Sequence, residues 1–448
     1  MSFPRYPEYK DSGVEWLGAV PKHWQAMSLR RLAKGVQTGG TPSTESPSPD
    51  LDSGFVWYTP GDFGESLCLA DSERKVSFEV VEAGEVKQFP SGSVLVVSIG
   101  ATLGKVGYIR QTSSANQQIN AIIPNALVDG YFLAYSLSVK SEAMRFLSNA
   151  STIGIMNQER TKDIWLAIPP RIEQSAITLF LDRETAKLDN LMAEQEKLIA
   201  LLKEKRQAVI AHAVTKGLDP TAPMKGSGVE WIGEIPNHWK VARIKDVARL
   251  ESGHTPSKTV PEYWEDCDIP WVSLNDSKQL ATTDYITETA HQINELGLRN
   301  SSARMLPADS VVFTRDATIG LAAIITRPMA VSQHLVAWCP TGLMNSVYLL
   351  RVFNAMKEHL DSFTFGATIK TIGMADIKRL ATPVPPISEQ IEVAAFIGKE
   401  SAQFDALIND AQHAIDLLKE RRTALISAAV TGQIDVRGLV KDEQEQAA

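Results

Sequence analysis

The segment GATLGKV at residues 100–106 has the residue types of a phosphate-binding loop, whose chemistry is to hold the phosphates of a nucleotide. It is one residue short between its two glycines, and Val106 stands where a Ser or Thr hydroxyl would bind magnesium. The similar segment DATIGL at residues 316–321 lacks the lysine as well. We therefore reject nucleotide binding at these loops.

Two further patterns suggest chemistry on nucleic acid. The prolines at 169–170 and 385–386 resemble part of an adenine methyltransferase motif, but its Asn and aromatic residue are missing and no Gly-rich cofactor loop follows an early strand. These prolines fit better in the first turn of a helix, where proline is tolerated. Pro-Asp at 49–50 with Glu-Val-Lys at 85–87 has a nuclease-like order, but so short a pattern often arises by chance.

The histidines and cysteines form no reactive or metal-binding group. The eight histidines are dispersed, and His23 and His238 each precede a tryptophan, which indicates a structural hydrogen bond. The chain has neither a Gly-x-Ser-x-Gly elbow nor a His-Glu-x-x-His motif. We expect no catalytic residue, no metal ion and no cofactor in this chain. The three cysteines, an odd number without C-x-x-C spacing, predict a reducing, cytoplasmic location and are Cys68, Cys267 and Cys339.

The composition is that of an ordinary globular protein, with 44% hydrophobic and 22% charged residues. No run of 18 apolar residues occurs and the first residues are polar, so we expect neither a transmembrane segment nor a secretory signal. The net charge of −8 argues against a protein that coats nucleic acid without specificity. A basic groove on an acidic body remains compatible with that charge.

The chain contains one unit twice. SGVEWLGAVPKHW at 12–24 returns as SGVEWIGEIPNHW at 227–239, with nine of thirteen positions identical at an offset of 227 − 12 = 215. So ordered a set of matches predicts a duplicated unit of roughly 215 residues. The later matches are TGGTPS with SGHTPS, Trp57 with Trp271, Asp62 with Asp276, IGATLG with RDATIG, Gln117 with Gln333, PPRIEQ with PPISEQ, and LLKEKR with LLKERR.

Each unit has two unlike parts. Residues 20–150 carry short apolar runs such as SVLVVSI (93–99), broken by Gly, Pro, Ser and Asn, which predict strands and turns. Residues 171–214 contain no Gly or Pro and predict one long helix. The expected fold class is α+β, with two pseudo-symmetric β-rich domains separated by two long antiparallel coiled-coil helices.

Each predicted helix has an apolar seam that steps by four and three residues, as in a coiled coil. The seam favours pairing of the two helices, which would hold the β-rich domains at a fixed distance; each helix could instead pack on its own domain. The first seam is Ile177, Leu181, Glu184, Leu188, Leu191, Gln195, Leu198, Leu202, Lys205 and Val209. The second is Val393, Ile397, Glu400, Phe404, Leu407, Ala411, Ala414, Leu418, Arg421 and Leu425.

The two β-rich domains share some residues and differ in their loops. Segments 44–56 and 63–89 have almost nothing in common with 258–270 and 277–306, which suits two binding sites for different DNA sequences. Loops also drift after any duplication, so this difference alone leaves both interpretations open. The candidate DNA contacts are Thr41, Ser43, Arg74, Lys75, Lys105, Arg110, Asn116, Lys258, Asn275, Lys278, Arg304, Arg315 and Lys370.

Taken together, the repeated GVEW segments, the GGTPS and GHTPS turns, the PPRIEQ and PPISEQ segments and the matched helix ends resemble the specificity (S) subunit of type I restriction-modification systems. The resemblance covers nearly the whole chain. It implies two target recognition domains that each bind one half of a bipartite DNA sequence, joined by helices that set the unread spacer. It also implies a non-catalytic subunit.

The resemblance implies several partners: double-stranded DNA, two modification subunits that dock on the helices, and two restriction subunits. S-adenosylmethionine, ATP and magnesium would be bound by those partners, which could also supply much of the phosphate contact that an acidic chain lacks. The alternatives are a duplicated coiled-coil scaffold whose β-domains bind protein, and a self-sufficient methyltransferase. The expected division is 1–152 and 219–367 for the recognition domains, with 153–218 and 368–448 for the spacer helices and tail.

Overall fold

The chain folds into two compact units: the first joins residues 1–195 with 413–448, and the second is the continuous segment 196–412. The computed structural model describes residues 3–44, 47–48, 53–148, 154–365 and 370–439. The Pro-Asp pair at 49–50 and the expected domain limits near 150–153 and 366–369 lie outside these residues. The division of the chain into recognition domains and spacer helices therefore stays a prediction.

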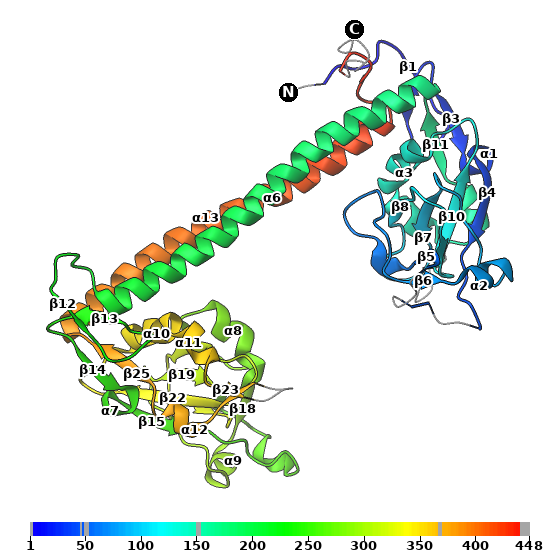
Figure 1. The fold of residues 1–448 in the computed structure, drawn as a ribbon. Helices are drawn as coiled ribbons and strands as arrows, with labels where there is room; N and C mark the ends of the chain where they lie inside the picture. Colours follow the sequence, from blue (N-terminus) through cyan, green and yellow to red (C-terminus); the bar gives the residue numbers. More distant parts are fainter. Residues whose placement is uncertain (1–2, 45–46, 49–52, 149–153, 366–369, 440–448) are drawn as a thin grey trace. The chain divides into compact units, whose positions relative to one another are not determined.

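The first unit is built on a four-stranded antiparallel sheet with the order β4-β10-β7-β8 (Figure 1). The apolar run predicted at 93–99 is confirmed as β7, a strand whose residues are all buried. Helix α3 packs on β7 and β8, and the Asp129 carboxylate caps its first turn. These elements are β4 (Ala33–Thr38), β10 (Ile119–Pro124), β7 (Val94–Val97), β8 (Val106–Tyr108) and α3 (Gly130–Ser138).

A smaller sheet with the order β6-β5-β9 completes the first domain. Strand β5 (Phe55–Tyr58) lies between β6 (Lys75–Val76), antiparallel to it, and β9 (Ser114–Ala115), parallel to it. The remaining elements are β1 (Tyr9–Asp11), β2 (Ala19–Pro21), β3 (Gln25–Ser28), α1 (Leu29–Leu32), a 3-10 turn (Pro60–Asp62), α2 (Phe78–Glu82), α4 (Ser141–Leu147), α5 (Gln158–Lys162) and β11 (Trp165–Ile168).

The second unit repeats this plan. Its larger sheet has the order β15-β22-β19-β20-β17, with one strand more than the first, and its smaller sheet has the order β18-β16-β21. The strands are β12 (Met224–Gly226), β13 (Glu234–Pro236), β14 (Lys240–Arg243), β15 (Ala248–Ser252), β16 (Ile269–Val272), β17 (Tyr285–Ile286), β18 (His291–Ile293), β19 (Val311–Thr314), β20 (Ala322–Ile325), β21 (Ala330–Val331), β22 (Leu335–Pro340), β23 (Thr364–Phe365), β24 (Thr371–Ile372) and β25 (Ala381–Val384). The helices are α7 (Ile244–Val247), α8 (Ser277–Thr282), α9 (Glu295–Arg299), α10 (Ser346–Ala355), α11 (Lys357–Asp361) and α12 (Met374–Ile377), with 3-10 turns at Pro261–Tyr263 and Leu274–Asp276.

The long helices begin where the prolines predict. Helix α6 (Arg171–Lys216) follows Pro169-Pro170, and α13 (Ile387–Val430) follows Pro385-Pro386. The first turn of α6 is anchored by the buried Glu173 carboxylate, which accepts hydrogen bonds from the Trp24 indole at 3.0 Å and from the Tyr6 hydroxyl, and contacts His23 Nε2 at 2.8 Å. Glu389 makes the same contacts with Trp239 and His238 at 2.8 Å each. The structural role expected for both histidines is confirmed.

The helices pack against each other within each unit (Figure 1). In the first unit Asp189 of α6 pairs with Arg422 of α13 at 2.9 Å, and in the second Arg206 pairs with Asp405. Asp405 follows Asp189 by 405 − 189 = 216 positions, and Arg422 follows Arg206 by the same number. One ion pair thus occurs twice, and the expected antiparallel pairing is confirmed. None of the described helices is long and apolar enough to cross a membrane.

The predicted seam has the right period, but every second residue in its list is wrong. In the observed stripe the next residue in the sequence takes that place. Leu191 and Leu198 are 51% and 43% exposed, whereas Met192 is 7% exposed. The buried and half-buried stripe of α6 is Leu181, Thr185, Leu188, Met192, Gln195, Ile199, Leu202, Arg206 and Val209. That of α13 shows the same displacement and is Ile397, Ser401, Phe404, Ile408, Ala411, Ile415, Leu418, Arg422 and Leu425.

The displacement can be tested with two neighbouring substitutions. We expect Met192→Ala to lower the free energy of unfolding by about 2 kcal/mol, since it removes a buried side chain. Leu191→Ala should change it by no more than about 0.5 kcal/mol, since that side chain is half exposed. Denaturant titrations followed by helical circular dichroism compare the two. If Leu191→Ala lowered the free energy of unfolding more than Met192→Ala does, the seam predicted from the apolar pattern would be the correct one.

Candidate functional site

A set of shared residues lies on and beside the central strand of the smaller sheet in both domains. We call it the frame: Trp57, Thr41, Gln117 and Asp62 in the first domain, and Trp271, Thr255, Gln333 and Asp276 in the second. Each tryptophan is 5% exposed, and its indole N–H donates to a backbone oxygen, Gly40 at 3.0 Å or His254 at 3.1 Å. In both copies the hydroxyl of the frame threonine donates to the side-chain oxygen of the frame glutamine.

The frame aspartates hold the turn that follows the tryptophan strand. Asp62 accepts hydrogen bonds from the backbone and hydroxyl of Thr59 at 2.6 and 2.8 Å. Asp276 does the same for Ser273 at 2.8 and 3.3 Å and also accepts one from Ala290 N at 2.7 Å. These are capping boxes, which fix the backbone of a short helical turn.

One glycine is required in each frame by a close approach of two backbones. A Cβ atom added to Gly39 would lie 2.2 Å from Ala115 O, and one added to Gly253 would lie 1.9 Å from Val331 O. The following residues donate to those same oxygens, Gly40 at 2.9 Å and His254 at 3.0 Å. The two frames therefore share their backbone contacts as well as their side chains.

Around each frame, equivalent positions carry different side chains, which we call the rim. Strand register identifies these positions. His291 pairs with Trp271 in the second domain, and Arg74 holds the equivalent place in the first, where its backbone oxygen accepts from Trp57 N at 3.0 Å. Likewise Ser332 N donates to Val272 O, and Asn116 N to Tyr58 O, at 2.9 Å each. The first rim is Thr44, Gly61, Arg74, Asn116 and Gln118. The second rim is Lys258, Asn275, His291, Ser332 and His334.

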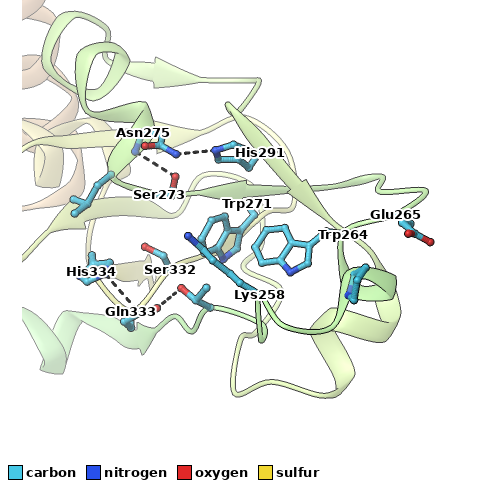
Figure 2. A pocket seen from close by; sticks show the side chains of 13 residues that line it. Lys258, Trp264, Glu265, Trp271, Ser273, Asn275, His291, Ser332, Gln333 and His334 are labelled. Atoms are coloured by element: carbon cyan, nitrogen blue, oxygen red, sulfur yellow. Dashed lines mark hydrogen bonds between the residues drawn. The ribbon is translucent and has the colours of Figure 1, made fainter.

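The second rim lines a cavity of about 670 Å³ together with Trp264 and Trp271 (Figure 2). Asn275 Nδ2 lies 2.7 Å from His291 Nε2, so the two side chains orient each other. His334 contacts the Asp316 carboxylate through Nδ1 at 2.8 Å and Gln333 Nε2 through Nε2 at 3.3 Å. Amide and imidazole groups that can both donate and accept hydrogen bonds therefore face a concave surface.

The first rim is more closed. Asn116 bonds to Gln118 through its amide at 3.1 Å and accepts from Gln118 N at 3.0 Å. Beside it, the Glu85 carboxylate accepts from Ser43 N, Ser43 Oγ, Thr44 N and Thr44 Oγ1 at 2.7, 3.0, 3.2 and 2.6 Å. The hydrogen bonds from the Thr44 hydroxyl and the Ser43 amide lower the pKa of Glu85 to about 2. The TPS turn of this domain is thus filled by an anion of the chain itself.

The structure brings some of the sequence-predicted contacts together. Thr41 belongs to the first frame and Ser43 to the adjoining turn, while Arg74 and Asn116 belong to the first rim. Lys258 and Asn275 line the cavity of the second domain, and Arg315 Nε donates to Gln333 O at 3.2 Å beside it.

The other predicted contacts lie elsewhere or bond to the chain itself. Lys105 donates to Phe63 O at 2.7 Å, and Arg304 donates to Glu251 at 3.2 Å. Lys370 lies 3.9 Å from the Asp361 carboxylate. Lys75 pairs with Val56 in the small sheet, Arg110 lies beside Cys68, and Lys278 is exposed on α8.

Sequence reasoning did not propose Glu85, Trp264, His291, Ser332 or His334 as site residues. His291 becomes visible only through the pairing register of β18 with β16, and Glu85 only through its hydrogen bonds. Gln333 could have been found, because its identity with Gln117 was apparent from the repeat.

The arrangement suits hydrogen bonding to a polar ligand, and within the described ranges no three His, Cys, Asp or Glu side chains gather as a metal ion would require.

The Glu85 contact yields a prediction for the TPS turn. We expect Glu85→Ala to increase amide hydrogen exchange at Ser43 and Thr44, because their N–H groups lose an acceptor. Glu82→Ala, which removes an exposed carboxylate three residues earlier, should leave both rates unchanged. Because the pKa of Glu85 is depressed, its contribution is present above the ordinary carboxyl pKa and is lost only as the pH falls through about 2. Equal amide exchange rates at Ser43 and Thr44 in the two variants would show that Glu85 does not hold this turn.

Comparison with known proteins identifies the family. The model of the type I restriction modification DNA specificity domain matches residues 21–200 and again 236–415. The MjaIX specificity subunit of Methanocaldococcus jannaschii is 31% identical over 193 residues, 42% of this chain and 43% of the relative, so the chain spans about half of that relative's length. The EcoDI specificity subunit of Escherichia coli is 20% identical over 93% of this chain and 90% of its own. A chain from a solved type I R-M system has the same fold, with a TM-score of 0.70, 15% identity, and coverage of 93% of this chain and 99% of that one. This chain therefore belongs to the type I restriction-modification DNA specificity family.

Proposed function

We propose that the chain is the sequence-specific DNA-binding specificity subunit of a type I restriction-modification complex. Each β-rich domain binds one half of a bipartite target. The chain itself performs no catalysis: two modification subunits methylate adenine with S-adenosylmethionine, and two restriction subunits cleave with ATP and magnesium. The complex acts on cytoplasmic DNA.

One observation carries this proposal: two frames with the same contacts present two rims with different side chains. Asn, Gln, His and Arg side chains are the groups that hydrogen-bond to base edges, and the two rims differ in which of them they carry. Two half-sites of different sequence require such a difference. The frames need not differ, because they hold the backbone on which the rims stand.

The acidic charge of the chain is compatible with this function. Phosphate contacts supply a large share of the affinity of DNA-binding proteins, and a chain with a net charge of −8 need not provide all of them. Partner subunits that enclose the DNA supply the remainder. The scaffold alternative gains no support from a family whose model is a DNA specificity domain.

Exchange of one domain tests the assignment of half-sites. Replacing residues 44–148 with the corresponding segment of a relative that has a different target should change one half of the methylated sequence and leave the other half unchanged. Methylation mapping of cells that carry the exchanged chain and a modification subunit measures this. A change in both halves would show that the domains do not bind independently.

Matched insertions test whether the helices set the spacer. Seven residues added after Lys197 in α6 and after His413 in α13 keep both Asp189–Arg422 and Arg206–Asp405 in register. At 1.5 Å per residue the pair lengthens by about 10 Å, so the unread spacer should grow by about 3 base pairs. An insertion in α6 alone breaks one of the two ion pairs and serves as the control. An active double insertion with an unchanged spacer would refute this role of the helices.

A further inference from the structure

The cavity of the second domain has a volume of about 670 Å³, in the range of small-ligand pockets, and it is open to solvent. A base in a stacked duplex presents only its edge to the groove, because its faces are covered by the neighbouring bases. A base turned out of the stack can enter a pocket, as happens in enzymes that act on single bases.

The walls of the cavity combine the two kinds of contact that an unstacked base needs. On one side lie Trp264 and Trp271, with ring centroids 5.5 Å apart and planes at 83°, and Trp264 is the more exposed of the two (Figure 2). Aromatic faces bind bases by stacking. The Asn275 and Gln333 side-chain amides also line the cavity, Asn275 beside His291 and Gln333 beside His334, and such amides can bond to the polar edge of a base (Figure 2).

One charged group at the cavity is open to a ligand, and an unpaired hydroxyl lies behind its wall. Ser332 is fully buried, and its hydroxyl, which has no hydrogen-bond partner in the described part of the chain, is covered by neighbouring atoms. Lys258 brings an ammonium group to the wall, where it can meet the phosphate of the same nucleotide. Glu265 is the one carboxylate among the lining residues, and Figure 2 places it at the outer edge.

The equivalent place in the first domain is built differently. Gly61 replaces Asn275 and Thr44 replaces Lys258. Asn116 replaces Ser332, and its amide is bonded to Gln118. The Glu85 carboxylate adds a negative charge beside Thr44, where a phosphate would otherwise lie. Among the described residues, the combination of Lys258 and Asn275 with Trp264 therefore occurs in the second domain.

We propose that the second-domain cavity binds a single nucleobase turned out of the DNA duplex, with its face against Trp264 and its edge on Asn275 and Gln333. The first domain reads its half-site without such a base. This inference rests on the proposed function, because it assigns the site to DNA that the domain recognises.

Mismatched duplexes test the proposal in the complex of this chain with its modification subunit. Each base of the second half-site is kept while its partner in the other strand is changed, and binding is measured by gel shift. At one position, other than the methylated adenine, a mismatch should strengthen binding by about tenfold, because part of the unpairing cost is already met. Mismatches in the first half-site should weaken binding.

Variants assign the effect to the cavity. Asn275→Gly and Ser332→Asn install the residues of the first domain, and both should abolish the gain at that position. Lys378→Ala, at an exposed residue that directly follows α12 and does not line the cavity, should retain it. Loss of binding for every second-half mismatch in the wild-type complex, or an equal gain in all three variants, would overturn the proposal. Absence of sequence-specific binding to the matched duplex would instead contradict the proposed function.

Discussion

Neither copy of the repeat can bury the seam of its long helix without the other copy. The first compact unit joins the N-terminal part of α6 to the C-terminal part of α13, and the second joins the remaining parts of both helices. The repeated ion pair, Asp189 with Arg422 and Arg206 with Asp405, shows that both junctions use the same geometry. Duplication within one chain therefore supplies each domain with the partner helix that it needs, and the anchoring carboxylates Glu173 and Glu389 connect those helices to the domains.

The division between frame and rim explains how such a protein can change its target without losing its fold. The polar atoms of the frame bond to the chain itself: the tryptophan indoles to backbone oxygens, the aspartates to their capping turns, and the threonines to the glutamines. Substituting the buried members Trp57, Trp271 and Asp276 would leave buried groups without partners, which destabilises a protein by about 1–3 kcal/mol for each group. The exposed rim residues, among them Arg74 and Asn275, can be exchanged at little expense of stability, and under the proposed function such an exchange would alter what is recognised.

Much of this architecture could be predicted from the repeat, since α6 begins at the expected residue and β7 occupies the expected apolar run. The seam was displaced because Thr185 and Arg206 belong to it; one is satisfied by Leu181 O at 2.7 Å and the other by Asp405, which an apolar pattern does not reveal. At the site, Lys258, Asn275 and Arg74 could be predicted from the sequence, because they lie in the loops that differ between the two copies. His291, Ser332 and Glu85 were not, because their positions depend on strand register and on a hydrogen-bonded turn formed between distant segments.

Single-base mapping of DNA methylation can show whether each domain binds one half-site. The chain would be produced with its modification subunit in a host that lacks other adenine methylation. We expect one asymmetric motif in two parts, separated by a gap of constant length in which any base occurs. A single continuous motif, or methylation without sequence preference from a folded and co-purifying complex, would contradict the assignment of one half-site to each domain.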